Sequence, residues 1–247
     1  MKKLFLLLPL LVLGGSQPPM EYAPFMLIRA ASSTLDTGLQ AYWTLDADGT
    51  DAIGSADLSN NNLVTFATAG IIGDAALFVA ASSQSLSHAD GFPFTKGDES
   101  FTYSVWVNCV TVSGEMGILG NFTLAGPYVI WFINGTDDFN VEFGNGTTTQ
   151  SVNGPDSMQS ATFYHLVFSY DASANELRLV INDGTPITAS YSGGSYDNND
   201  TWYLGHFSGF YFNGLIDEVG VWSRTLTGSE ITELYNSGAG FRPPSVP

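Results

Sequence analysis

Three acidic residues, Asp46, Asp48 and Asp51, lie within six positions of one another, with Gly49 among them. Their carboxylates are the hard oxygen ligands that calcium requires, so the segment is a candidate site for a structural calcium ion. It is not an EF-hand loop, because Asp51 stands where that loop needs its glycine. Aspartate also forms turns and caps loops, and the sequence leaves this second interpretation open.

Paired carboxylates are the second chemistry to consider, because a retaining glycosidase needs two of them about 5–5.5 Å apart. On a strand, acids separated by one residue point to the same face. Asp217 and Glu218 are instead adjacent, as are Asp98 and Glu99, so each pair is expected to point to opposite faces. This pattern argues against glycan hydrolysis.

The three histidines, His88, His165 and His206, are scattered along the chain. Zinc sites need histidines at ligand spacing, which is absent, and the sequence contains no G-x-S-x-G motif for a serine nucleophile. We therefore expect no catalytic residues and no enzymatic activity.

A sugar-binding surface would combine an aromatic ring with amide or hydroxyl neighbours. In the predicted strand that begins at Phe101, alternation places an apolar set on one face and Thr102, Ser104, Trp106 and Asn108 on the other. Trp106 and Asn108 are therefore candidate ligand-binding residues. The alternative is that Trp106 packs beneath a neighbouring loop. The aromatic run at 202–212, WYLGHFSGFYF, is compatible with a binding loop and equally with core strands.

The composition narrows the classes of protein further. The chain has 247 residues, of which 44% are hydrophobic and 13% charged, as expected for one packed β domain with a Ser-, Thr- and Asn-rich surface. Seven basic residues stand against 24 acidic ones, a formal net charge of −17, so binding to nucleic acid through phosphate neutralisation is excluded. The single cysteine, Cys109, lies in an apolar run and is expected to be a buried thiol.

Residues 1–19 have the order of a signal peptide: two lysines, an apolar stretch from Leu4 to Leu13, then small residues and a proline pair. The apolar stretch is too short to span a bilayer as a helix, which takes about 20 residues. The alternative is a retained hydrophobic terminus that docks on a partner chain. Residues 20–37 are predicted to be a connecting arm and residues 38–247 the folded domain.

From Leu39 onward, short β-like runs alternate with turn dipeptides such as Asn145-Gly146 and Asp183-Gly184. This spacing predicts an all-β fold of two packed antiparallel sheets, a β-sandwich. One short helix is expected near the C-terminus. Thr227 and Glu230 form a capping box at its start, Leu226 and Ile231 a hydrophobic staple, and Gly238 is the expected C-cap.

The sequence NGLIDEVGVW followed by this capped helix and by NSG resembles the C-terminal part of laminin-G-like, concanavalin A-like lectin/glucanase jelly-roll domains. The segments GLQAYWTLD, FTYSVWVN and FYHLVFSYD resemble earlier strands of that family, so the likeness extends over residues 38–240. Tyr164 departs from the family, which commonly has tryptophan there. The resemblance implies a structural calcium whose ligands include Asp217 together with the early acidic turn, and a structural role for His165.

Together these features predict a non-catalytic, lectin-like binding module that recognises a glycan or another surface ligand at a cell or particle surface. The alternative is a structural coat or virion surface protein that uses the sandwich for assembly, with an oligomeric or assembly partner. Glycan hydrolysis is the weaker alternative. The leader implies a secreted or cell-surface location, and the coat alternative implies a virion surface. No membrane span is expected.

Overall fold

The computed structural model describes residues 32–89, 98–112, 114–121, 127–133, 138–155, 158–194 and 201–247, and for 127–133 it describes the backbone. The predicted leader, residues 1–19, and most of the arm, residues 20–37, lie outside these ranges. One compact unit runs from Ser33 to Pro247. It therefore begins before Gly38, and the reason is Leu35, which is fully buried and whose carbonyl accepts a hydrogen bond from Trp222 Nε1 at 2.7 Å.

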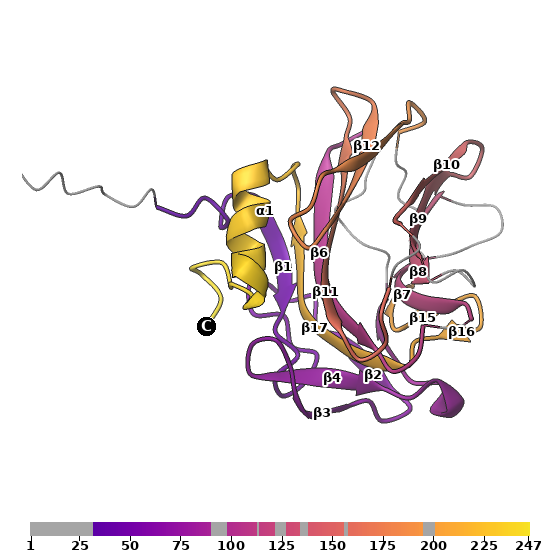
Figure 1. Ribbon diagram of the computed structural model, residues 1–247, viewed down its shortest axis with the longest axis vertical. Helices are drawn as coiled ribbons and strands as arrows, with labels where there is room; N and C mark the ends of the chain where they lie inside the picture. Colours follow the sequence, from indigo (N-terminus) through magenta and orange to yellow (C-terminus); the bar gives the residue numbers. More distant parts are fainter. Residues whose placement is uncertain are drawn as a thin grey trace, which may run out of the picture. The chain divides into compact units, whose positions relative to one another are not determined.

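Two antiparallel sheets form the sandwich (Figure 1). The eight-stranded sheet has the order β13-β12-β11-β6-β17-β4-β3, with β1 paired to β17, and the seven-stranded sheet has the order β10-β9-β8-β7-β14-β5-β2. The strands of the first are β1 (Leu39–Trp43), β3 (Thr65–Ala69), β4 (Asp74–Phe78), β6 (Phe101–Cys109), β11 (Phe163–Asp171), β12 (Glu176–Ile181), β13 (Ile187–Ser190) and β17 (Gly214–Trp222). Those of the second are β2 (Ser59–Asn61), β5 (Ser85–His88), β7 (Met116–Asn121), β8 (Pro127–Ile133), β9 (Phe139–Asn145), β10 (Thr149–Asn153) and β14 (Trp202–Leu204). A separate hairpin joins β15 (His206–Phe207) to β16 (Phe210–Tyr211).

The main core lies between the two sheets and follows the predicted alternation along β6. Phe101, Tyr103, Val105 and Val107 all belong to this core. Phe101 packs against Phe143 of β9 with ring centroids 5.5 Å apart, so the inner faces of the two sheets meet directly. Cys109 is a buried free thiol in the same core. Burial of this apolar surface is the main stabilising contribution to the fold.

A second, smaller core lies on the outer face of the eight-stranded sheet, where α1 (Gly228–Tyr235) covers it (Figure 1). Ile231 and Leu234 project from the helix into this core, as their spacing predicts. Leu226, the other half of the predicted staple, is buried in the same cluster as Ile231. The helix therefore covers part of the outer face of this sheet.

The helix begins as predicted and ends differently. The side chain of Thr227 accepts a hydrogen bond from the Glu230 backbone and the Glu230 side chain accepts one from the Thr227 backbone, which confirms the capping box. The C-cap is Asn236, with φ 46°, and a short 3₁₀ turn at Asn236–Gly238 follows. Asparagine tolerates the left-handed conformation, so it ends the helix before the predicted glycine is reached.

A β-bulge in β17 overturns the prediction that Asp217 and Glu218 point to opposite faces. Pairing with β6 shifts register between Asp217 and Gly220, and Glu218 adopts φ 50°. Ile216 and Val219 both enter the main core, so the two acids between them lie together on the outer side. The all-β, two-sheet antiparallel sandwich with one short C-terminal helix is confirmed. Among the residues described, no helix is long and apolar enough to cross a membrane.

Candidate functional site

Trp106 is not on an open face, and the prediction that it offers a sugar-stacking platform is wrong. Only 3% of it is exposed, and its ring stacks between His165 and Tyr235 with centroid distances of 4.8 and 5.7 Å. The alternative, that Trp106 packs beneath a neighbouring segment, is closer to the structure. The covering segment is the helix α1 rather than a loop. Asn108 is half-buried, paired in register with Phe163 and Leu215.

His165 has the structural role that the family resemblance implied. Its Nε2 lies 2.8 Å from Ser104 Oγ in the layer under the helix. Burial lowers the pKa of its imidazole to about 3, so the ring is neutral at physiological pH. A neutral ring stacked on Trp106 suits a packed layer rather than a catalytic or metal site.

Asp51 and Asp48 form backbone turns. Asp51 is buried, and its Oδ1 accepts hydrogen bonds from the backbone N–H groups of Tyr42 and Ile53, both at 3.0 Å, while Oδ2 accepts one from Ala56 at 3.0 Å. Asp48 is exposed, and hydrogen bonds from the Thr50 hydroxyl and from the Thr50 backbone N–H, the latter at 2.8 Å, lower the pKa of its carboxyl. Both therefore act as turn formers.

Asp46 is neutralised by a cation that the chain itself supplies. Arg242 Nη2 lies 2.6 Å from Asp46 Oδ2 and 2.6 Å from Glu218 Oε1. The hydroxyl of Tyr42 donates a 2.6 Å hydrogen bond to the other oxygen of Glu218. The guanidinium of Arg242 thus lies between the carboxylates of Asp46 and Glu218 and offsets their charge, as a bound metal ion would.

Asp217 is fully buried and bound to backbone. Its Oδ2 accepts hydrogen bonds from the N–H groups of Ile71 at 2.7 Å and Ile72 at 3.3 Å, and its Oδ1 accepts one from Glu218 at 2.9 Å. Burial, with Glu218 next to it, raises the pKa of this carboxyl to about 8.

The four aspartates therefore do not share one centre, and they do not fit calcium as a set. Asp46 faces a guanidinium, and Asp51 and Asp217 direct their oxygens at backbone N–H groups rather than at an open coordination site. Within the described part of the chain, no group of three or more His, Cys, Asp or Glu side chains is disposed to hold a metal ion. Melting experiments in chelator and in calcium test the calcium binding that the sequence predicted.

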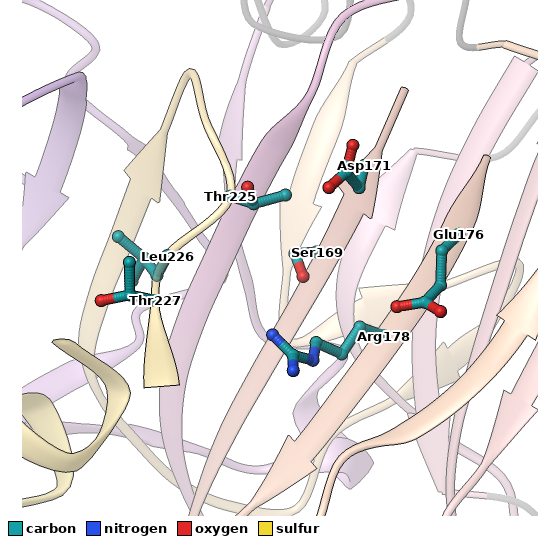
Figure 2. Close-up of a pocket in the computed structure, with 7 residues that line it drawn as sticks. All are labelled: Ser169, Asp171, Glu176, Arg178, Thr225, Leu226 and Thr227. Atoms are coloured by element: carbon teal, nitrogen blue, oxygen red, sulfur yellow. The ribbon is translucent and has the colours of Figure 1, made fainter. Parts of the chain in front are cut away.

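A polar pocket of about 190 Å³ lies beyond the edge of α1, on the outer face of the eight-stranded sheet. Its lining comes from β11, β12 and the segment that enters the helix, and it comprises Ser169, Asp171, Glu176, Arg178, Thr225, Leu226 and Thr227 (Figure 2). Antiparallel pairing sets Ser169 opposite Arg178 and Asp171 opposite Glu176, so the four side chains share one face. The Thr225–Thr227 wall is held by Thr102, whose hydroxyl accepts from the N–H of Leu226 at 3.1 Å.

Arg178 is the central group of this pocket. In Figure 2 its side chain leaves β12 and extends toward Leu226 and Thr227, across the pocket from Asp171. Its Nε is buried without a hydrogen-bond partner, and no ion pair with Asp171 or Glu176 is formed among the described residues. Arg178 also lines a neighbouring pocket of about 180 Å³ beside Asp183. The pocket thus holds hydrogen-bond donors and acceptors that do not satisfy one another.

The Arg178 pocket was not predicted from the sequence, although a signal for it existed. The segment FYHLVFSYD was interpreted only as a strand that resembles the family, and no role was assigned to the residues after it. Asp171 ends one strand, and Glu176 and Arg178 follow on the next with one residue between them, which places all three on one face. Asp171 additionally closes the turn. Its Oδ1 accepts hydrogen bonds from the Ser173 hydroxyl at 2.7 Å and from the backbone N–H of Ala174 at 3.0 Å, and these lower the pKa of its carboxyl.

Comparison with known proteins agrees with this fold. A family model for the concanavalin A-like lectin/glucanases superfamily matches residues 80–232, more than half of the chain, so the protein belongs to this superfamily. No curated protein sequence matches the chain.

Solved structures of similar fold come from several kinds of protein. Domain 4 of AbnA, a GH43 extracellular arabinanase from Geobacillus stearothermophilus, in complex with arabinotriose, has a TM-score of 0.63 at 18% identity over 82% of this chain and 98% of that one. The binding domain of Paraclostridial Mosquitocidal Protein 1 has a TM-score of 0.66 at 16% identity over 81% of this chain and 52% of its own. The binding domain of Botulinum Neurotoxin DC in complex with SialylT has a TM-score of 0.61 at 13% identity, over 81% of this chain and 51% of its own. The chain thus spans about half the length of the two toxin domains, and at these identities the likeness concerns the fold.

Proposed function

We propose that this protein is a non-catalytic glycan-binding module and that the pocket beside Arg178 receives one sugar unit. The observation that carries the proposal is the unpaired state of Arg178, which lies near two carboxylates without forming an ion pair. A buried donor without a partner costs free energy, about 1–3 kcal/mol, so a ligand that provides an acceptor is favoured there.

The chemistry of the lining suits a hydroxyl-bearing ligand. The guanidinium of Arg178 only donates hydrogen bonds, whereas the carboxylates of Asp171 and Glu176 only accept them. A sugar hydroxyl does both, so neighbouring hydroxyls on one ring can bridge the donor and the acceptors. The pocket volume of about 190 Å³ is below the roughly 300–1,000 Å³ of sites for drug-sized ligands, which favours a single sugar residue as the bound unit.

The related folds support a binding role without establishing the ligand. One is a domain of an extracellular arabinanase in complex with arabinotriose, and two are binding domains of toxins. A non-catalytic role also accords with the two adjacent acids of β17, of which Asp217 is 0% and Glu218 2% exposed. We further propose that the module acts outside the cell, either secreted or at a surface, as the leader-like residues 1–19 suggest.

The test is a printed array of neutral, sialylated and plant cell-wall oligosaccharides, followed by titration of any glycan that binds. Arg178→Ala and Glu176→Gln should each weaken binding about tenfold or more, because each removes a hydrogen bond to a charged group. The matched control is Glu99→Gln, which makes the same charge change at an exposed position outside the pocket.

Two results would refute this assignment. One is that every glycan bound by wild type is bound equally well by Arg178→Ala and Glu176→Gln, which would exclude the pocket as a binding site. The other is wild-type protein that binds nothing on the array. If that protein also assembled into oligomers, the coat or assembly alternative would gain support.

A further inference from the structure

The aromatic run at 202–212 divides into core and surface residues. Trp202 and Phe212 are buried in the main core, and Trp202 stacks on Trp43 with centroids 5.6 Å apart. Tyr203, His206, Phe207 and Tyr211 are half-buried, and Phe210 is 39% exposed. Sequence patterning could not choose between a binding loop and core strands because the run supplies both.

The hairpin β15–β16 has the geometry needed to present these rings. Ser208 and Gly209 both have positive φ, 45° and 91°, as a two-residue turn between twisted strands requires. Gly205 has φ 80°, and a Cβ there would collide with the ring of Phe78. The chain can therefore leave β14 (Trp202–Leu204) and turn sharply into the hairpin only because that residue is glycine.

Three aromatic rings at this surface, those of Tyr203, His206 and Tyr211, contact one another in sequence. His206 stacks on Tyr211 with centroids 4.5 Å apart at 25°, and Tyr203 meets His206 edge-on at 4.8 Å and 85°. His206 Nε2 also accepts the backbone N–H of Gly209 at 3.1 Å, which fixes the ring. Since a stacked partner covers only one face of a ring, the far face of Tyr211 is left uncovered by His206. We call Tyr203, His206 and Tyr211 the aromatic shelf.

Small neutral polar residues adjoin the aromatic shelf on the outer face of the seven-stranded sheet. Tyr203 is paired with Ser87, and Ser87 in turn with Ser59, so the three side chains point to the same side. The amide of Asn61 donates a 2.9 Å hydrogen bond to the hydroxyl of Ser87. None of these groups is ionised, and burial lowers the pKa of His206, which keeps its ring neutral at physiological pH.

We propose that the aromatic shelf with Asn61 and Ser87 is a second carbohydrate site that binds a neutral pyranose. The apolar C–H face of the sugar lies on a tyrosine ring, and its hydroxyls reach the amide and the serine hydroxyls of the neighbouring strands. An anionic ligand is disfavoured, because the protein carries a net charge of −17 and the shelf has no basic side chain. A nucleic acid, which also stacks on aromatic rings, is disfavoured for the same reason.

This site is separate from the Arg178 pocket, because the shelf belongs to the seven-stranded sheet and its hairpin and the pocket to the eight-stranded sheet. The proposal is consistent with a glycan-binding module but does not rest on the pocket. The two sites differ in the ligand expected: charged groups surround the pocket, whereas the shelf offers aromatic faces and neutral hydrogen-bonding groups.

Isothermal titration with cellohexaose, mannohexaose and laminarihexaose tests the shelf, each against the intact chain. At least one of these neutral oligosaccharides should bind, and Tyr211→Ala should weaken it about tenfold or more by removing apolar contact area. Tyr211→Phe keeps the ring and should retain binding within about threefold. Asn61→Ala should weaken binding without touching the rings, and this second variant keeps the test valid if Tyr211→Ala does not fold.

The control is Glu99→Gln, at an exposed position outside both sites, which should leave this binding unchanged. The proposal is overturned if none of the three oligosaccharides binds, if Asn61→Ala and the folded Tyr211→Ala variant bind as wild type does, or if Arg178→Ala alone abolishes binding. The last result would assign neutral sugars to the pocket, so failure of the shelf and failure of the pocket are distinguishable.

Discussion

The described part of the chain contains three arginines, and they fall into two kinds of environment. Arg224 and Arg242 each form an ion pair with an N–O distance of 2.6 Å, the first with Glu230 and the second with both Glu218 and Asp46. Arg178 lies on β12, near the carboxylates of Asp171 and Glu176. It forms an ion pair with neither, and its Nε has no hydrogen-bond partner. In a chain this poor in basic residues, one cation left without a partner is a candidate for ligand binding.

The difference separates arginines that link parts of the fold from the one that we propose to bind a ligand. Arg224 binds Glu230 through two nitrogens, at 2.9 and 2.6 Å, and so joins the start of α1 to the segment before it. Arg242 joins the C-terminal segment to β17 through Glu218, which is 2% exposed. Arg178 connects no two elements in this way. Substitution should therefore affect stability at the first two positions and binding at the third.

The largest effect is expected for Arg242→Ala. Removing the guanidinium leaves Glu218 buried beside Tyr42 and Asp46 without a counter-charge, and breaking such a pair costs about 3–5 kcal/mol. Urea denaturation monitored by tryptophan fluorescence measures the loss. Arg178→Ala is the matched control and should not lower the free energy of unfolding, because it breaks no ion pair and removes a buried donor that has no partner. Equal stability losses in the two variants would erase the distinction between them.

An intermediate effect is expected at Glu230, and it depends on pH. The hydrogen bonds from Arg224 lower the pKa of this carboxyl from 4.5 to about 2. A folded-state pKa below the unfolded value stabilises the protein above pH 4.5, and the contribution disappears as pH falls toward about 2. Glu230→Gln should therefore cost about 1.5–3 kcal/mol at neutral pH and much less near pH 2.

Denaturation curves of wild type and Glu230→Gln across this pH range provide the measurement. The difference in unfolding free energy between them should shrink steadily on acidification. A difference that is independent of pH would show that the Arg224–Glu230 pair does not stabilise the charged carboxylate.

Elements defined by local chemistry were predictable from sequence, and those defined by pairing between distant strands were not. The capping box of Thr227 and Glu230 is contained in four residues, and it was predicted correctly. Alternation along β6 correctly identified the inward face. It could not show that α1, more than a hundred residues later, covers the outward face and buries Trp106.

The same limit explains the errors at the candidate sites. The bulge that brings Asp217 and Glu218 to one side arises from a register shift against β6, which a strand pattern does not reveal. The Arg178 pocket exists because the Thr225–Thr227 segment passes beside β11 and β12, far away in sequence. The guanidinium that faces Asp46 comes from the other end of the chain, so the early acidic turn gave no sign of it.

The smallest effect is expected for calcium, which should not change the melting temperature. A melting experiment with calcium extends the comparison from arginines to metal ions. The Arg242 side chain already offsets the charge of Asp46 and Glu218, and the oxygens of Asp51 and Asp217 accept backbone hydrogen bonds. A cation that bound only the folded state would stabilise it by about 2.7 kcal/mol at a hundredfold excess over Kd. For a chain of this size that would raise Tm by roughly 5–10 °C, which a melting scan readily resolves.

We therefore expect the same Tm in chelator and in millimolar calcium, with magnesium as a further control. A higher Tm in calcium alone would contradict this and restore the metal site that the early aspartates and the family resemblance predicted. Asp217→Asn would then decide whether the β17 carboxylate takes part, since it removes the charge and keeps the size. Arg242→Ala provides the complementary variant, because it exposes Asp46 and Glu218 to each other without a cation. If calcium raised the Tm of that variant and not of wild type, the guanidinium would be shown to perform the charge compensation that a metal ion could otherwise provide.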